Sequence, residues 1–333
     1  MRTAGSFGCA GYKLMTMAEH FREDSVISVA VRIDAEHPQG ILFDPHQPQL
    51  RITDLGAVRG DGIFETMLAV DGAVKQFEPH LDRLRRSAEI TDIGIPPEES
   101  WRAAVELGLE EFRTRGSLPE EVTVRLTATR GVDGEPASED PHWAGTYWAL
   151  LTPVPEATKA GRGTPVAVTL LDRGYDSGAA DRAPWLMLSA KTLSYAVNMA
   201  ALRWAKQHGF DDVVFVTSDG QVLEAPTSTL VLMTLSEDGA PTLITPTLKT
   251  GILPGTTQGA VFAGAERAGW KLGYGPVTPE QVKDADHAWL LSSVRLASPV
   301  NRVDEAEKPV SERYTADLMD FLAQDLAETY PVE

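Results

Sequence analysis

The sequence predicts an α+β protein built of two lobes. A chain of 333 residues is long enough for two domains, and its hydrophobic content of 43% suffices for a large core. Strand-like and helix-like stretches alternate along it, and a connection rich in Pro, Gly and Thr, TPVPEATKAGRGTP, separates them into two groups. We expect an N-terminal extension (1–27), a small mixed α/β domain (28–153), an interdomain loop (154–164) and a large domain (165–333).

The small domain is expected to begin with strands. SVISVAVRI and GIFETMLAVDGAVKQF predict strands, and Asp71-Gly72 inside the second stretch is typical of a hairpin turn. The alternation in GIFETML also predicts a strand with an exposed apolar face. Two helices follow, in EPHLDRLRRSAEITDIG and from about residue 98 to 115, and the strand pair EVTVRLTATRG and GTYWALLTPV completes this domain.

The large domain opens with the strand VAVTLLD. Further on, DDVVFVTSDGQVLEAPTSTLVLM predicts a hairpin at Asp219-Gly220, with Glu224 at the end of its second strand. GILPGTT leads into a helix that ends at Gly269, and HAWLLSSVRLASPVNRVD predicts two strands around a polar turn. An amphipathic helix at 310–329 closes the chain.

Charge and cysteine content exclude several classes of protein. The chain has 30 Lys and Arg against 48 Asp and Glu, a net charge of -18. A surface of this charge repels nucleic acid and anionic membranes, so we expect neither as a partner. No stretch is apolar for the length of a membrane span. The only cysteine, Cys9, excludes an intrachain disulfide and a cysteine-rich metal site, which fits a cytoplasmic protein.

One lysine follows an apolar run near the middle of the large domain. Trp185 to Leu188 predict a buried strand, and apolar residues from Leu193 to Trp204 recur at the spacing of an amphipathic helix, which places Lys191 at a strand-to-helix junction. Apolar packing lowers the pKa of an ammonium group and leaves a neutral nucleophilic amine, as a Schiff-base lysine requires. The alternative is a lysine at a strand end whose amine reaches solvent.

Three further features suit cofactor binding by such a lysine. Glu224 offers a carboxylate that would keep a pyridine nitrogen protonated. GILPGTT before a helix offers backbone N–H groups and the hydroxyls of Thr256 and Thr257 to a phosphate, and Arg83 can turn inward as a bidentate phosphate partner. Each feature alone also has an ordinary explanation: a solvated glutamate, a capped helix and a basic helix face.

Motifs of rival chemistries are missing from the chain. There is no G-x-x-x-x-G-K-[ST] phosphate loop, no H-E-x-x-H zinc helix and no G-x-S-x-G nucleophile elbow. RGDGIFE breaks the glycine spacing of a dinucleotide fingerprint and precedes a strand. These absences favour the lysine-based interpretation.

Six motifs occur in the order known from one enzyme family: RGDGIFET, HLDRLRRSAE, SAKTLSYAVNMAALR, SDGQVLEAPTSTLVL, GILPGTTQ and SSVRLASPV. Over roughly residues 40 to 330 the sequence resembles class IV aminotransferases, the fold type IV pyridoxal 5'-phosphate enzymes, and is most similar to their actinobacterial aminodeoxychorismate lyase branch. The resemblance implies pyridoxal 5'-phosphate as cofactor. It also implies a D-amino acid aminotransferase-like fold, with a small mixed α/β N-terminal lobe and a larger pseudo-barrel C-terminal lobe.

The resemblance implies roles for individual residues. Lys191 matches the catalytic Schiff-base lysine, and Glu224 matches the carboxylate at the pyridine nitrogen. Tyr195 is placed near the ring hydroxyl of the cofactor. The phosphate is held by Arg83, Thr256, Thr257 and Ser293.

The reaction itself remains open at this point. A lyase would convert 4-amino-4-deoxychorismate into 4-aminobenzoate and pyruvate for folate biosynthesis, whereas an aminotransferase would act on branched-chain or other amino acids or amines. An inactive binding relative is a third alternative, against which the presence of both Lys191 and Glu224 argues. The loop VDGEPASEDPHW has His142 but no arginine, which weighs against the family's D-amino acid branch.

Arginines are the candidates for binding substrate carboxylates. Arg59 and Arg130 are the proposed substrate-binding residues, and Arg125 is a further available cation. Because the offset between Arg125 and Arg130 is odd, at most one of the two should face the cavity. The family resemblance also implies a homodimer with the site near the subunit interface and the loop from Arg59 to Gly62 close to the partner's site.

Overall fold

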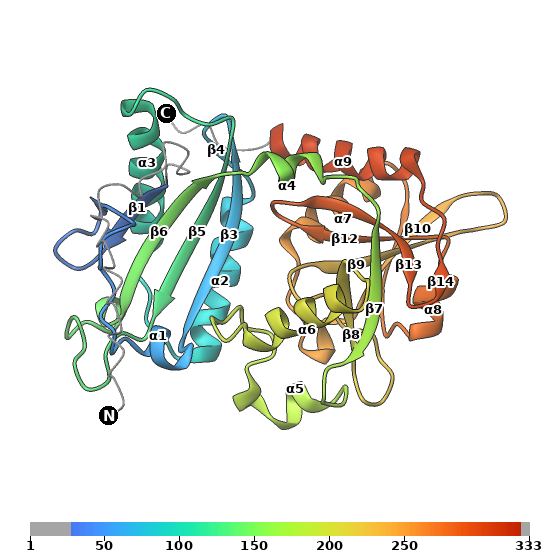
Figure 1. The fold of residues 1–333 in the computed structure, drawn as a ribbon, viewed down its shortest axis with the longest axis horizontal. Coiled ribbons are helices and arrows are strands. Elements are labelled where there is room, and N and C mark those ends of the chain that lie inside the picture. The colour runs from blue at the N-terminus through green and yellow to red at the C-terminus, as the bar shows by residue number, and fades with distance from the viewer. Residues whose placement is uncertain (1–27, 328–333) are drawn as a thin grey trace, which may run out of the picture.

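The computed structural model describes residues 28–327 and divides them between two β-sheets (Figure 1). Strand β6 ends the first sheet at Pro153, and β7 begins the second at Val166. Helix α4 (Glu156–Ala160) lies in the connection between them. The extension predicted for residues 1–27 lies outside the described residues.

The first sheet is antiparallel throughout and has the order β2-β1-β6-β5-β3-β4. Its strands are β1 (Val29–Ile33), β2 (Ile41–Phe43), β3 (Gly62–Val70), β4 (Ala73–Val74), β5 (Glu121–Thr129) and β6 (Thr146–Pro153). The helices around it are α1 (Leu55–Arg59), α2 (Phe77–Thr91) and α3 (Glu98–Thr114), with a 3-10 turn at Pro141–Trp143. The predicted strand pairs and both long helices are confirmed, whereas β2 and α1 were not predicted.

Backbone conformation confirms the first predicted hairpin. Asp71 and Gly72 have φ angles of 50° and 82°, so both central residues of the β3–β4 turn are left-handed, as a tight hairpin turn requires. The expectation of an exposed face on GIFETML was wrong. Ile63 and Met67 pack into the core with α2 and α3, while Phe64 and Thr66 face a cavity on the opposite side of the sheet.

The second sheet follows the path β11-β10-β9-β12-β13-β7-β8, with β14 paired to β13. Its strands are β7 (Val166–Asp172), β8 (Asp212–Val216), β9 (Thr229–Leu235), β10 (Pro241–Pro246), β11 (Lys271–Gly275), β12 (His287–Ser292), β13 (Leu296–Val303) and β14 (Ala306–Glu307). Its helices are α5 (Ala179–Arg182), α6 (Ala196–Gln207), α7 (Thr256–Arg267), α8 (Pro279–Asp284) and α9 (Glu312–Ala327), with 3-10 turns at Pro184–Leu186 and Leu248–Thr250. The predicted strand pair β12–β13 and helices α7 and α9 are confirmed.

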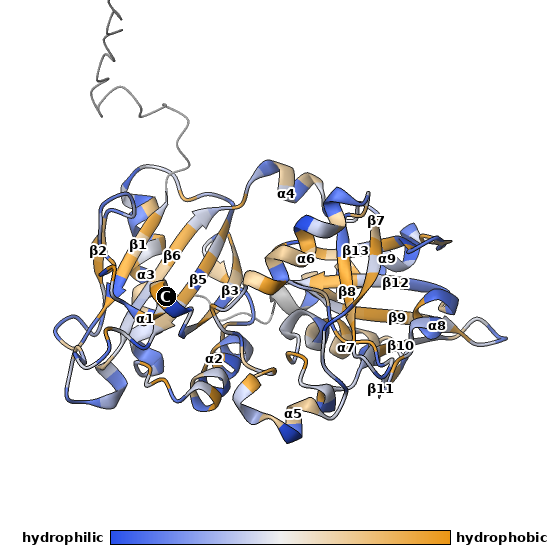
Figure 2. Cartoon of the chain, turned by 60° about the horizontal axis from the view of Figure 1, so that its bottom comes forward, coloured by the Kyte–Doolittle hydropathy of each residue, from blue (hydrophilic) through white to orange (hydrophobic). Residues whose placement is uncertain are grey.

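Hydrophobic residues gather on the strands of both sheets (Figure 2). In the first sheet the core includes Trp101 of α3 and Tyr147 of β6. In the second sheet α7 and α9 pack together over β12. Gly264 of α7 permits this approach, because a Cβ atom there would lie 2.4 Å from Cβ of Phe321.

Two predictions for the large domain need correction. The run from Trp185 to Leu188 is not a buried strand: it begins with the 3-10 turn at Pro184–Leu186, and the side chain of Trp185 is 73% exposed. Pro184 has no N–H to donate to a sheet, and Met187 adopts a left-handed φ of 50°, so this stretch turns instead of extending. Helix α6 is present, but Val197 and Trp204 of its apolar stripe are 54% and 41% exposed.

The second predicted hairpin is shorter than expected. Gly220 has a left-handed φ of 86°, but the returning arm makes a single bridge, between Val216 and Val222. Glu224 therefore lies in irregular backbone and not at a strand end, although its carbonyl accepts a hydrogen bond from the N–H of Phe215. None of the helices described in residues 28–327 is both long and apolar enough to cross a membrane.

Candidate active site

A cavity of about 660 Å³ lies between the two sheets. The first sheet and α2 contribute Phe64, Thr66, Arg83 and Arg125 to its wall. The larger share comes from the second half of the chain, including Lys191, Tyr195, Glu224, Thr256, Thr257 and Ser293. All seven residues predicted to bind the cofactor thus line one cavity.

Backbone hydrogen bonds to β3 fix the position of Lys191. The N–H of Phe64 donates to the carbonyl of Lys191 (3.0 Å), and the N–H of Leu193 donates to the carbonyl of Gly62 (2.7 Å). On α2, the hydroxyl of Ser87 accepts a hydrogen bond from the N–H of Lys191 (3.0 Å). The lysine therefore precedes α6 on an extended segment that is attached to the first sheet.

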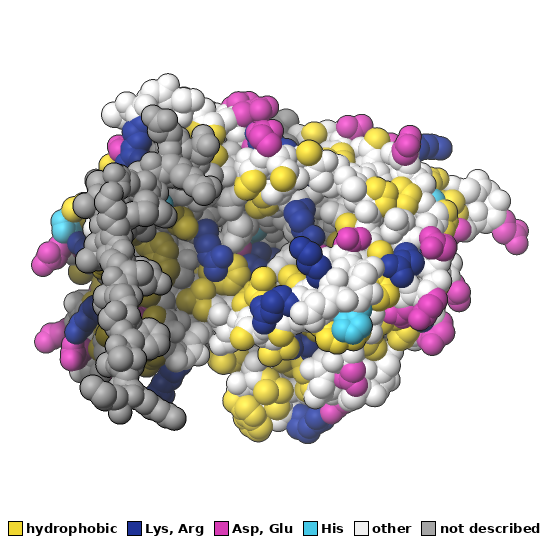
Figure 3. All heavy atoms as spheres, in the orientation of Figure 1, with side chains coloured by type: hydrophobic (Ala, Val, Ile, Leu, Met, Phe, Trp, Pro, Cys, Tyr) yellow, Lys and Arg dark blue, Asp and Glu magenta, His cyan; other side chains and the backbone are white. Residues whose placement is uncertain are grey.

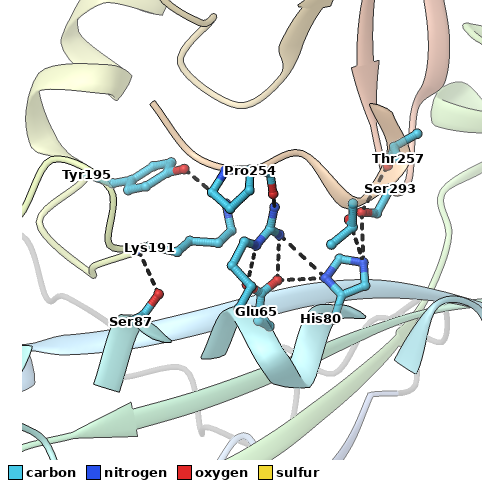
Figure 4. Close-up of polar contacts among 10 residues, drawn as sticks. Glu65, His80, Ser87, Lys191, Tyr195, Pro254, Thr257 and Ser293 are labelled. Carbon is cyan, nitrogen blue, oxygen red and sulfur yellow. Dashed lines mark hydrogen bonds and ion pairs between the residues drawn. The ribbon is translucent and has the colours of Figure 1, made fainter. Parts of the chain in front are cut away.

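The amine of Lys191 points into the cavity, and the ring of Tyr195 lies beside it (Figure 4). Its Nζ lies 3.2 Å from the hydroxyl oxygen of Tyr195 and 4.7 Å from the centroid of the Phe64 ring. The rings of Phe64 and Tyr195 meet edge to face at 5.2 Å. This packing restricts the amine to one region of the cavity, where it can act on a bound molecule.

Glu224 presents a half-buried carboxyl group to the same cavity. Burial raises the pKa of Glu224 to about 7, although the N–H of Leu253 and the charges of Lys191, Arg83 and Arg173 act to lower it. The hydrogen bond from Leu253 to Oε1 is long, at 3.3 Å. A carboxyl group in such surroundings is suited to accept a hydrogen bond from a cationic N–H group of a ligand.

Arg83 is held by a buried carboxylate. Its Nε and Nη2 donate to the two oxygens of Glu65, each at 2.7 Å, and its Nη1 donates to the carbonyl of Pro254 at 2.9 Å. His80, one helical turn before Arg83, contacts the same carboxylate through Nδ1 at 2.7 Å. Arg83 thus turns inward from α2, as predicted.

Hydroxyl groups from the start of α7 and from the β12–β13 turn lie against this cluster. The Nε2 atom of His80 is 3.1 Å from the hydroxyl oxygen of Thr256 and 3.2 Å from that of Ser293. The hydroxyls of Thr257 and Ser293 are 3.4 Å apart. Thr256 begins α7, whose N-cap residue Gly255 makes no capping side-chain bond, so the helix presents N–H groups suited to an anion.

The two predicted substrate arginines lie outside this cavity. Arg130 does not line its wall: Nε donates to Asp61 at 2.8 Å, and its other nitrogens donate to the carbonyls of Thr91 and Asp92 at the end of α2. The structure therefore does not support Arg130 as a substrate contact in this chain's own cavity. Arg59 is exposed at the end of α1 and does not line the wall either.

Of Arg125 and Arg130, at most one was expected to face the cavity, and Arg125 does so. It lines the cavity and stacks on Phe64, with its guanidinium carbon 4.1 Å from the ring centroid. Arg130 lies one residue past the end of β5, and only one arginine of the pair lines the cavity, as predicted. Arg173 and Arg295 also line the cavity and were not predicted from the sequence.

Glu65 and His80 were also missed, although the sequence contains a signal for one of them. His80 precedes Arg83 by three residues, which places both on the same side of α2. Glu65 carries no such local signal, because its burial depends on how α2 packs against β3.

The chain is similar to known proteins over most of its length. Residues 62–303 match the family described as amino-transferase class IV. The chain is 41% identical to the bifunctional aminodeoxychorismate lyase / D-amino acid transaminase of Mycobacterium tuberculosis over 272 residues, which is 81% of this chain and 91% of that relative.

Solved structures show the same fold. The fold IV-transaminase CpuTA1 from Curtobacterium pusillum superposes with a TM-score of 0.82 at 39% identity, covering 91% of this chain and 100% of that chain. A PLP-bound hypothetical aminotransferase from Mycobacterium tuberculosis superposes with a TM-score of 0.79 at 36% identity, covering 90% of this chain and 98% of that chain.

The chain belongs to the amino-transferase class IV family. It is an enzyme that depends on pyridoxal phosphate, which confirms the family and cofactor expected from the six motifs. An amino acid substrate is consistent with this family.

The residues around the cavity fit this cofactor. Its chemistry requires an amine for its aldehyde, a carboxylate for its ring nitrogen and an anion site for its phosphate. Lys191 and Glu224 supply the first two groups on the cavity wall. Arg83, the hydroxyls of Thr256, Thr257 and Ser293 and the uncapped start of α7 offer the third. In Figure 4, Thr257 and Ser293 lie on the opposite side from Tyr195.

The pKa of Glu224 generates a first test on the cofactor-free chain. The native carboxyl keeps its proton up to about pH 7, whereas in the unfolded chain it ionises near 4.5. Only the unfolded state is ionised between these values, so the contribution of Glu224 to the free energy of unfolding falls as pH rises through this range, by on the order of 3 kcal/mol. Carbon-13 NMR of labelled glutamate should show a carboxyl titrating at about pH 7.

Two variants assign that signal. The transition should disappear in Glu224→Gln and persist in Glu237→Gln, which removes an exposed glutamate on the β9–β10 loop. A Glu224 signal that titrates below pH 5 would contradict the effect of burial described above.

Proposed function

We propose that this chain is a 4-amino-4-deoxychorismate lyase that forms 4-aminobenzoate and pyruvate. Besides Arg83, three more arginines line the cavity wall, of which Arg295 pairs with Asp212. The observation that carries this proposal is the presence of the other two, Arg125 and Arg173. Aminodeoxychorismate bears two carboxylates, and a pair of cations in a confined site suits such a dianion. The similarity to the bifunctional enzyme of Mycobacterium tuberculosis supports the same reaction.

The two arginines lack carboxylate partners within the described residues. Arg125 makes a cation–π contact with Phe64, and Arg173 stacks on Phe215 and donates to the side-chain oxygen of Asn198 at 3.2 Å. Burial lowers the pKa of Arg125, which reflects the cost of keeping its charge away from water. An anionic ligand would offset that cost.

The chain's own groups can be assigned to the steps of the reaction. Pyridoxal phosphate, when bound, supplies an electron sink for the carbon that bears the amino group of the substrate. Lys191 would hold the cofactor through Nζ, and the same atom, when free, would take the proton from that carbon. Tyr195 keeps Nζ in place through its hydroxyl, and the carboxylate of Glu224 accepts the N–H of the ring nitrogen.

Breaking the C–O bond to the enolpyruvyl group would make the substrate ring aromatic, and the proton held by Lys191 would return to the departing enolpyruvate to give pyruvate. No amino acceptor is needed for this reaction. An aminotransferase, in contrast, returns the proton from Lys191 to the cofactor and needs a keto acid to complete its cycle.

A class IV aminotransferase is the second candidate function. It is favoured by one observation, the similarity to a relative whose name includes D-amino acid transaminase activity. The absence of an arginine from the loop VDGEPASEDPHW still weighs against D-amino acids in particular. A catalytically inactive relative is disfavoured because Lys191 and Glu224 line the same cavity.

The requirement for a keto acid separates the two candidate reactions. We expect purified protein to release pyruvate and 4-aminobenzoate from aminodeoxychorismate with no keto acid present. Lys191→Ala should lower this rate by at least about 10²- to 10⁴-fold, because the general base is lost. Lys271→Ala, on strand β11 outside the cavity, is the matched control. Product formation that occurs only after addition of a keto acid would identify an aminotransferase instead.

Arg125 generates a second test, of substrate binding. Arg125→Leu should raise KM for aminodeoxychorismate by roughly 10- to 100-fold, the value of a charge-assisted hydrogen bond, and leave the visible spectrum of the bound cofactor unchanged. Arg86→Leu removes an exposed arginine from α2 as the control. Steady-state kinetics with an unchanged KM for Arg125→Leu would place the substrate carboxylates elsewhere.

We further propose that the protein is a homodimer. Trp185, Leu186, Val197, Met199 and Trp204 expose apolar side chains along the 3-10 turn and α6. Figure 3 shows hydrophobic side chains gathered on this part of the surface, at the α5 end of the large domain. Leu186 and Met199 also line the cavity, so a second copy seated here would exclude water from the site as it buried the patch. The loop at 59–62 would then approach the partner's cavity.

Sedimentation tests this assembly. Trp185→Asp should weaken dimerisation by at least about 30-fold, the cost of losing a hot-spot residue, and activity should fall with the dimer fraction on dilution. Tyr274→Ser removes a similarly exposed aromatic side chain on β11 as the control. A wild-type monomer with full activity at assay concentration would reject this arrangement.

A further inference from the structure

A buried Glu65–His80 pair lies directly behind the phosphate-binding candidates. The two side chains are 0% and 1% exposed, and neither lines the cavity. Glu65 comes from β3 and His80 from α2, while the hydroxyls that His80 meets come from helix α7 and from the turn between β12 and β13 (Figure 4). The pair therefore links the two sheets through one imidazole ring.

The contacts of the pair define where the protons lie. Burial acts to raise the pKa of Glu65, but the charge of Arg83 and hydrogen bonds from Arg83 and His80 outweigh it and hold that pKa well below its ordinary value. An ionised Glu65 is an acceptor only, so Nδ1 of His80 carries the proton that points at it. In a neutral ring Nε2 is then an acceptor, which can take one hydroxyl proton, from Thr256 or from Ser293.

That arrangement is unfavourable for a bound phosphate dianion. The charge of Arg83 is balanced by Glu65, so the two together add no net positive charge. A phosphate ester carries nearly two negative charges at pH 7 and accepts hydrogen bonds only. A neutral His80 also draws a hydroxyl proton away from it. A proton on Nε2 reverses both effects, because the ring becomes a cation and the hydroxyl protons of Thr256 and Ser293 are free to point at phosphate oxygens.

We propose that His80 is a positioning residue of the phosphate site, which takes up one proton from solvent at Nε2 when a phosphate dianion binds, while Glu65 holds the ring through Nδ1. This inference rests on the proposed phosphate-binding role of Arg83, Thr256, Thr257 and Ser293. The charged groups that face His80 are Glu65 from β3, Arg83 from α2 and Lys191. Only hydroxyls reach it from α7 and the β12–β13 turn.

The empty and occupied sites should therefore hold different forms of the ring. Without ligand, burial lowers the pKa of His80, and the hydrogen bond and charge of Glu65 only partly oppose this. A bound dianion adds negative charge beside Nε2 and raises that pKa. The complex therefore binds one proton more than the free protein. As pH rises from the pKa of His80 in the free protein to its pKa in the complex, phosphate affinity should fall by up to about tenfold per pH unit.

Nitrogen-15 NMR of the full chain labelled in histidine reads the ring directly. At pH 7.5 we expect His80 to show one protonated nitrogen in the cofactor-free protein and two in the holoenzyme. His80→Gln assigns the signal, and His46→Gln, in an exposed turn, is the control. The wild-type chain has 7 histidines, and we expect the ring signals of one of them to change. This change can be measured even if the variants do not fold. A His80 ring in the same protonation state with and without cofactor would overturn the proposal.

Calorimetry with inorganic phosphate counts the proton independently. At pH 8, in buffers of different ionisation enthalpy, the cofactor-free chain should take up about one proton per phosphate, and Glu65→Gln and His80→Gln about none. Thr257→Ala should bind phosphate more weakly and keep the proton uptake. Phosphate binding without proton uptake would overturn the role of His80 alone. Unchanged binding in both Thr257→Ala and Arg83→Leu would overturn the phosphate site itself, and the inference with it.

Discussion

The alternation of side chains along β3 and β5 decides which residues reach the cavity. One face of the first sheet is sealed by α2 and α3, and the opposite face forms a wall of the cavity. Neighbouring side chains therefore point to opposite faces of the sheet: Thr66 faces the cavity, and Glu65 faces α2. A shift of register by one residue would exchange these sets and bury Arg125 in the helix-covered core.

The second half of the site depends on backbone pairing between β3 and the segment around Lys191. Hydrogen bonds from Phe64 to Lys191 and from Leu193 to Gly62 join β3 to the segment before α6, at the point where the amine enters the cavity. The cofactor-binding candidates come from α2, from the start of α7 and from connecting segments of the second half of the chain, so the site exists only in this arrangement. Because β3 is held in place by its own core, the segment that pairs with it is held rigidly, and Lys191 is positioned more precisely than on a free loop.

Electrostatics at the site runs against the charge of the whole molecule. The chain carries a net charge of -18, yet its cavity gathers Arg83, Arg125, Arg173 and Lys191. Buried carboxyl groups moderate that local excess: Glu65 pairs with Arg83, and Glu224 lies at the cavity wall. The same negative surface that repels polyanions thus encloses a site suited to a small anionic cofactor and an anionic substrate.

The sequence alone determined the elements that depend on local signals, namely the Asp71-Gly72 turn, helices α2, α3, α7 and α9, and the six motifs that place Lys191, Glu224 and Arg83. Strand β11 escaped prediction because it is short and pairs with β10 across a long helical connection, and β10 escaped prediction as well. The tertiary structure decided that Arg125 and not Arg130 lines the cavity, that Glu65 and His80 are buried together, and that the run after Pro184 stays exposed. These outcomes depend on which face of one element packs against another, a nonlocal contact that no short stretch of sequence records.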